Sequence, residues 1–233
     1  MANFLRMLVG LALLPAAWGL SRTLWDAVVI AAGGAGGFSV EVVSLLAGLM
    51  AFALCWATVS HPVRAYVLGH ELTHALWGLM FGARPSDVRV TAAGGSVQLD
   101  KTNFLITLAP YFFPFYTFIV VVAAIITYAF IRPLPFLPLW LFLIGFTWSF
   151  HLLFTLETLA PRQPDVKLYG RIFSWTVIII LNIALVLVWL ASTTVLTFDG
   201  LWEIVRARVA DAYVGVGGGF LWLWRRGRAL CGK

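Results

Sequence analysis

The chain has 233 residues, of which 61% are hydrophobic and 11% are charged, and its mean hydropathy is +0.94. A soluble domain of this length cannot bury that much apolar surface, so the composition indicates a membrane-embedded protein. The formal net charge is +6. Basic residues lie at the ends of apolar runs and in the last stretch, where they would face anionic lipid headgroups, so we expect a lipid bilayer and no nucleic acid as partner.

Long apolar runs predict about six membrane-spanning helices, because a helix needs roughly 20 apolar residues to cross the hydrocarbon core. We expect the first run to be a retained membrane helix and not a cleaved signal peptide, since the rest of the chain is equally apolar. The expected fold is an all-α, multi-pass integral membrane protein of a cell or inner membrane. In chain order the expected spans are residues 4–20, 38–60, 62–82, 103–131, 135–160 and 170–197.

Three further segments depart from this pattern. The short run 24–32 ends in a glycine-rich stretch, residues 33–37, which predicts a flexible break. In residues 86–100 valines alternate with polar residues around two glycines, which predicts a small β-hairpin at the membrane interface, since lipid cannot satisfy an open sheet edge. Residues 200–224 have mixed polarity and predict an interfacial helix with a break at residues 217–219.

One motif carries chemistry: residues 70–74 read His-Glu-Leu-Thr-His. On a helix, His70 and His74 lie on one face and can bind one zinc ion. Glu71 lies next round the turn, where it is not a ligand. Zinc lowers the pKa of a bound water to roughly 7, so Glu71 can take its proton as the general base and pass it to a leaving amine.

The alternative to a zinc site is a buried polar patch between helices. The residues on both sides of the motif are apolar, from Ala65 to Gly69 and from Ala75 to Phe81. Ionisable groups inside a membrane helix cost at least roughly 2–3 kcal/mol each, so this cluster requires a partner. A zinc ion is the natural partner, and the sequence therefore favours a zinc site.

A catalytic zinc ion usually has three protein ligands and one open position. The extended pattern HExxHxxGxxH fails, because Met80 stands where its third histidine would be. The remaining candidates for the third ligand are His61, Asp87, Asp100, His151, Glu157 and Asp165.

The positions of these candidates separate them. Asp87 and Asp100 flank the hairpin and are expected to be solvated turn residues, His61 precedes Pro62 at a helix entrance, and Glu157 lies near a helix end, where it can reach the interface. His151 belongs to a polar stripe with Thr147, Thr155 and Thr158, which should face a protein interior or a water cavity. It is either a ligand or a satisfied polar contact. Asp165 follows a proline at a helix start, where an Asp is also a common N-cap.

The stretch Gly69-His-Glu-Leu-Thr-His-Ala-Leu, with Phe81-Gly82 and a valine-rich hairpin after it, resembles the site-2 protease family, the M50 class of intramembrane metalloproteases. Residues 108–111 resemble its Gly-Pro turn, and residues 154–156 and 161–165 resemble its later helix and proline-rich loop with an Asp. The resemblance covers roughly residues 62–170 and implies Asp165 as the third zinc ligand, with His151 as the rival.

The chain departs from the family pattern at three positions. Pro164-Asp165-Val166 replaces the usual Leu-Asp-Gly, and Thr155 stands in place of an Asn. Nothing resembles the PDZ domain that many relatives carry.

Motif and resemblance together predict a zinc-dependent intramembrane endopeptidase that hydrolyses a peptide bond within or near a transmembrane helix of a membrane-protein substrate. The alternative is a non-catalytic membrane zinc-binding scaffold or an ion transporter, but a pure zinc-binding site has no need of an unligated Glu71. We expect one membrane-embedded domain over residues 1–233, with a metalloprotease core at about 62–197 and a basic interfacial segment at 200–233.

The depth of the motif in an apolar helix points to the substrate. A membrane helix can reach that depth laterally and must unwind before cleavage, so we expect a single-span protein with helix-breaking residues near the cut. The hairpin offers an edge to which an unwound strand can add. Residues 33–37, Pro110 and Pro114 would loosen a gate between spans.

Overall fold

A computed structural model describes residues 2–33, 40–59, 61–91, 94–159, 163–193 and 196–231. Contacts between residues group the chain into two compact units, residues 1–37 with 169–233, and residues 38–168. The expectation of one membrane-embedded domain stays a prediction.

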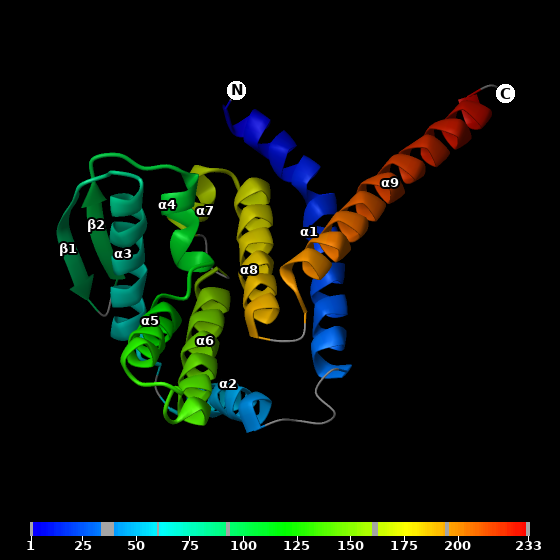
Figure 1. Cartoon of the computed structure of the whole chain (residues 1–233). Coiled ribbons are helices and arrows are strands. Elements are labelled where there is room, and N and C mark those ends of the chain that lie inside the picture. Colours follow the sequence, from blue (N-terminus) through cyan, green and yellow to red (C-terminus); the bar gives the residue numbers. More distant parts are fainter. Residues whose placement is uncertain are drawn as a thin grey trace. The chain divides into compact units, whose positions relative to one another are not determined.

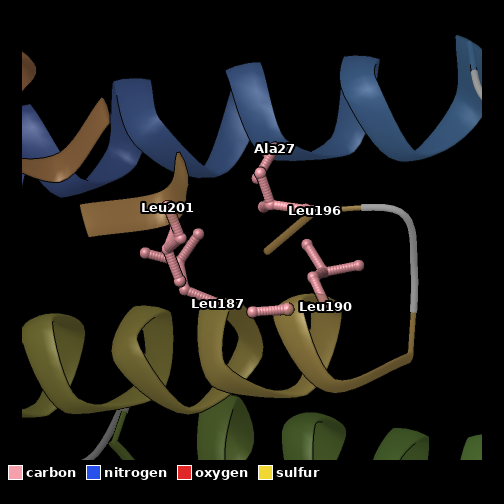
Figure 2. Packing of buried hydrophobic residues seen from close by; sticks show 6 residues of the cluster. Ala27, Leu187, Leu190, Leu196 and Leu201 are labelled. Carbon is pink, nitrogen blue, oxygen red and sulfur yellow. The ribbon is translucent and has the colours of Figure 1, made fainter. Parts of the chain in front are cut away.

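Among its described residues, the first unit contains three helices: α1 (Ala2–Gly33), α8 (Arg171–Thr193) and α9 (Phe198–Cys231) (Figure 1). Buried apolar side chains from all three helices and from the segment before α9 meet in one cluster, which Figure 2 shows from close by. An ion pair also joins α9 to α1, with 2.6 Å between Arg208 Nε and Asp26 Oδ2. The cluster consists of Ala27, Leu187, Leu190, Ala191, Leu196 and Leu201.

Two of these helices are longer than the sequence predicted. Helix α1 continues past residue 20 to Gly33, so the runs 4–20 and 24–32 form one helix. Residues 34–37 of the expected flexible break lie outside the described part of the chain. The expected break at residues 217–219 is wrong, because α9 runs through them. A glycine costs a helix only about 1 kcal/mol relative to alanine, so a few glycines weaken a helix without ending it.

The second unit contains the other elements: α2 (Val40–Thr58), α3 (Val63–Met80), β1 (Pro85–Thr91), β2 (Gly94–Leu99), α4 (Phe104–Leu108), the 3₁₀ turn η1 (Ala109–Tyr111), α5 (Phe115–Phe130), α6 (Leu137–Leu159) and α7 (Pro164–Leu168). Helices α2 and α5 pack against α6, and the hairpin packs against α3 (Figure 1). The backbones of α2 and α6 lie close together, since a Cβ atom on Gly145 would stand 2.2 Å from the Leu45 carbonyl oxygen. Small residues allow such close packing between apolar helices.

The predicted hairpin is confirmed: β1 and β2 form a two-stranded antiparallel sheet. The register shifts between Ser86 and Arg89, where Asp87 has a φ of 48°. Ser86 pairs with Gln98 and Arg89 pairs with Ser96. Asp87 and Val88 therefore oppose the single residue Val97, which is the arrangement of a β-bulge.

Within the described residues, four helical stretches are long and apolar enough to cross a membrane: Asn3–Ala31, Val40–Thr58, Leu137–Leu159 and Arg171–Ser192. The pair Phe104–Tyr111 and Phe115–Phe130 makes a fifth if it is one span. The expected number of about six is not confirmed. Helix α3, which covers the expected span 62–82, is not in this group, because His70, Glu71 and His74 make it less apolar.

The expected span over residues 103–131 is bent in the structure. The segments Phe104–Tyr111 and Phe115–Phe130 are bent by 84° relative to each other. Pro110 and Pro114 explain the bend, since a proline has no N–H to continue a helix and its ring displaces the preceding turn. Pro114 stands immediately before the first residue of α5.

Candidate metal centre

Helix α3 carries the motif, and its C-terminal end directs the chain into the hairpin. The Ala83 N–H donates to the Gly78 carbonyl at 2.8 Å and the Gly82 N–H donates to the Leu79 carbonyl at 2.9 Å. Gly82 has a φ of +71°, so this end is a Schellman motif, which favours glycine at that position. The reversal brings the hairpin back alongside α3, next to the motif.

The fold brings His70, His74 and Asp165 together. The Nε2 atoms of the two histidines are 3.2 Å apart, and Asp165 Oδ2 lies 3.6 Å from His70 Nε2 and 3.7 Å from His74 Nε2. One ligand atom from each side chain lies within 4.8 Å of the others, and no other such group of three is found in the described part of the chain. Two imidazole nitrogens and one carboxylate oxygen are donors that suit a first-row transition metal.

A backbone carbonyl fixes the ring of His74. His74 Nδ1 lies 2.9 Å from the Ile106 carbonyl oxygen, and because a carbonyl only accepts, Nδ1 carries the proton and Nε2 keeps its lone pair for a metal. In a continuing helix the Ile106 carbonyl would accept from residue 110, but Pro110 has no N–H. The helix holding Ile106 is capped by Asn103, whose side chain accepts from the Ile106 N–H at 2.9 Å.

Tyr66 lies beside the second imidazole. Its hydroxyl is 3.3 Å from His70 Nδ1, so His70 also has its Nε2 atom directed at the cluster. Tyr66 is one helical turn before His70 and therefore on the same face of α3. Its ring stacks on Phe154 of α6, with 4.7 Å between ring centroids, which fixes the hydroxyl in place.

Asp165 belongs to the first turn of α7, and Tyr111 holds it. The Tyr111 hydroxyl donates to Asp165 Oδ2 at 2.9 Å, and Tyr111 is fully buried. Burial acts to raise the pKa of the Asp165 carboxyl, but the neighbouring His70, His74 and the Tyr111 hydroxyl outweigh it and hold this pKa below its usual range. The carboxylate is therefore ionised at neutral pH. The alternative of an N-cap does not apply, because α7 begins one residue earlier, at Pro164.

Glu71 lies beside this cluster without belonging to it. Its side chain is buried, with 7% exposed, and it lies against β2, since a Cβ atom on Gly95 would stand 2.9 Å from Glu71 Oε1. His70, His74, Glu71 and Asp165 line one cavity of about 620 Å³, together with residues of β2 and the segments around α4 and α7. A reactant in this cavity would meet the three candidate ligands and a separate carboxylate at once.

His151 lies beside a second cavity that His70 also lines. It is buried, its Nε2 atom has no hydrogen-bond partner in the described part of the chain, and it lines a small cavity of about 20 Å³ with Gly69, His70 and Tyr116. The polar stripe of α6 faces inward here, since Thr155 is buried as well. His151 is not part of the group of three potential ligands.

The other candidate ligands lie away from the cluster. His61 Nδ1 is 3.6 Å from Glu157 Oε1, and its ring stacks on Trp56. Asp87 is exposed and pairs with Arg89 at 2.8 Å, and Asp100, also exposed, accepts from the Arg84 N–H at 2.8 Å. None of these four belongs to the described group of potential ligands.

Several residues of the site escaped the sequence interpretation. Tyr66 carried a signal, because it stands four residues before His70. Tyr111 and the Ile106 carbonyl carried none, since a backbone group has no sequence signature and Tyr111 is distant from the motif in sequence.

Comparison of the chain with protein-family models, with curated proteins and with solved structures gave no match. The resemblance to the site-2 protease family therefore rests on the quoted residues alone, and what it implies for activity belongs to the proposal below.

Proposed function

We propose that the chain is a multi-pass integral membrane protein and a zinc-dependent intramembrane endopeptidase. The observation that carries the proposal is the meeting of His70, His74 and Asp165 around one point, with ligand atoms within 4.8 Å of one another. Glu71 stands beside them in the same cavity. The resemblance of residues 62–170 to the site-2 protease family, stated above, supports the same function.

The donor set fits zinc. Two histidines and one carboxylate hold zinc in several catalytic sites and leave a fourth position open. The Ile106 carbonyl and the Tyr66 hydroxyl orient the two imidazoles, and Tyr111 orients the carboxylate. Such outer contacts commonly fix metal-ligating side chains. When bound, zinc would polarise the scissile carbonyl and lower the pKa of a water molecule.

The chain's own residues would transfer the proton and bind the substrate. Glu71 takes the proton of the attacking water and passes it to the amine that leaves, which is the role of a general base and then of a general acid. The exposed edge of the hairpin offers backbone groups that an unwound substrate strand can pair with. Leu99 and Val97 of β2 line the same cavity, so a strand bound there would lie next to Glu71.

The alternative, a zinc-binding scaffold or an ion transporter, is less well supported. A site that only binds metal has no use for a buried carboxylate that is not a ligand. Burial of such a group is costly unless it is used or paired. Glu71 is therefore the feature that favours an enzyme over a scaffold.

The third ligand is tested by substitution. We expect Asp165→Ala to weaken zinc retention more than His151→Ala does, because only Asp165 lies with the two motif histidines. Zinc per chain is measured by mass spectrometry after dialysis of both variants in detergent. If His151→Ala loses the metal and Asp165→Ala keeps it, the assignment is reversed.

The proposed activity is tested on a membrane substrate. The enzyme is reconstituted in liposomes with a single-span protein that has glycine or proline near the middle of its helix. Release of two fragments is expected, because those residues let the helix unwind and expose a carbonyl. The matched control is the same helix with leucine at those positions, which should be cut more slowly. An enzyme that cuts only soluble peptides would contradict intramembrane proteolysis.

A further inference from the structure

Strand β2 lies directly on the face of α3 that carries the motif. Side chains at alternate positions of a strand share a face, and here Gly95 and Leu99 both meet α3. A Cβ atom on Gly95 would stand 2.6 Å from Glu71 Cγ and 2.7 Å from Val67 Cγ1, and a Cβ atom on Gly78 would stand 2.9 Å from Leu99 Cδ2. At Gly95 of the strand, the helix side chains of Glu71 and Val67 fill the space, and at Gly78 of the helix, the strand side chain of Leu99 fills it. These two contacts fix how the strand lies along the helix.

Val97, the residue between these two contacts, lines the same cavity as Glu71. It stands opposite the bulge of β1 and has no partner in the register of the ladder. Bulges commonly lie next to active sites, where they end pairing or redirect a group. The residue opposite this bulge lies two residues from Gly95, which contacts Glu71.

We infer that strand β2 positions the Glu71 carboxylate, because Gly95 leaves the room in which it lies and a side chain at that position would displace it. Gly95 is thus a positioning residue, which acts through Glu71. The catalytic consequence rests on the proposed function, whereas the contact between Gly95 and Glu71 does not. A carboxylate that is displaced from the reacting water by about 1 Å loses much of its effect, since such shifts cost up to about a hundredfold in rate.

The kinetic test is Gly95→Ala. No positive φ occurs at Gly95, so alanine suits the backbone there and its methyl group acts through the contact with Glu71. We expect kcat to fall about tenfold to a hundredfold, with KM and zinc content unchanged. The matched control is Gln98→Ala, an exposed position on the opposite face of β2, which should leave kcat unchanged. If Gly95→Ala keeps its kcat, or loses it only together with zinc, the inference is overturned.

A second readout does not need catalysis. The side-chain carbon resonances of Glu71 are followed by NMR in protein labelled at glutamate. They should shift in Gly95→Ala, because the added methyl group meets Glu71 Cγ, and they should stay in place in Gln98→Ala. Unchanged Glu71 resonances in Gly95→Ala would overturn the inference even if proteolysis is found. A shift would support it even if no proteolysis is found, so the two proposals can fail separately.

Discussion

Glu71→Gln is expected to lower kcat for a transmembrane substrate by about 10²- to 10⁴-fold, the range that general acid–base catalysis contributes, and to leave zinc bound. Glutamine has nearly the same shape, so it fits the same space beside Gly95. It cannot take a proton from water. Because Glu71 is not in the group of potential ligands, the metal should stay. Initial rates in liposomes and zinc content are measured on the same preparation.

The control for this substitution is Glu157→Gln. Glu157 is an exposed carboxylate on α6 that pairs with His61, so its neutralisation changes the charge of the protein equally without touching the cavity. It should retain the parent rate. A Glu71→Gln enzyme that cleaves as fast as the parent would show that Glu71 does not take the proton. The argument from Glu71 against a zinc-binding scaffold or an ion transporter would then be lost.

The second large effect is expected from His74→Ala. Loss of an outer contact costs roughly 10–100-fold in metal affinity, and loss of a ligand should cost more. Zinc affinity should therefore fall more than about a hundredfold, and activity should fall with it. The affinity is measured by competition with a chromogenic chelator.

His61→Ala is the matched control for His74→Ala. It removes an imidazole that stacks on Trp56 and contacts Glu157, outside the cluster. Zinc affinity should be unchanged. If both variants bind zinc as the parent does, the cluster around His74 is a polar contact between elements and not a metal site.

Local sequence patterns predicted what depends on local geometry. The spacing of His70 and His74 placed them on one helix face, and the alternation in residues 86–100 predicted the hairpin that the structure contains. Both follow from the periodicities of helix and strand. Helices α2, α6 and α8 likewise begin and end close to the limits that the apolar runs predicted.

Tertiary features could not be predicted in this way. Residue spacing alone could not decide whether Asp165 or His151 is the third ligand, because the distance of each from the motif depends on how α6 and α7 pack. The size of the 84° bend between Phe104–Tyr111 and Phe115–Phe130 could not be predicted from a uniformly apolar run, even though Pro110 and Pro114 are present in it. The role of the Ile106 carbonyl depends on that same bend. The bulge opposite Val97 is a feature of strand register, which composition does not encode.

Zinc content of the purified chain tests the central claim most directly. The protein is purified in detergent without added metal, offered zinc, dialysed, and analysed by mass spectrometry against protein concentration. We predict close to one zinc ion per chain, because His70, His74 and Asp165 form the described site. A chain that remains free of zinc after the metal is offered would contradict the account.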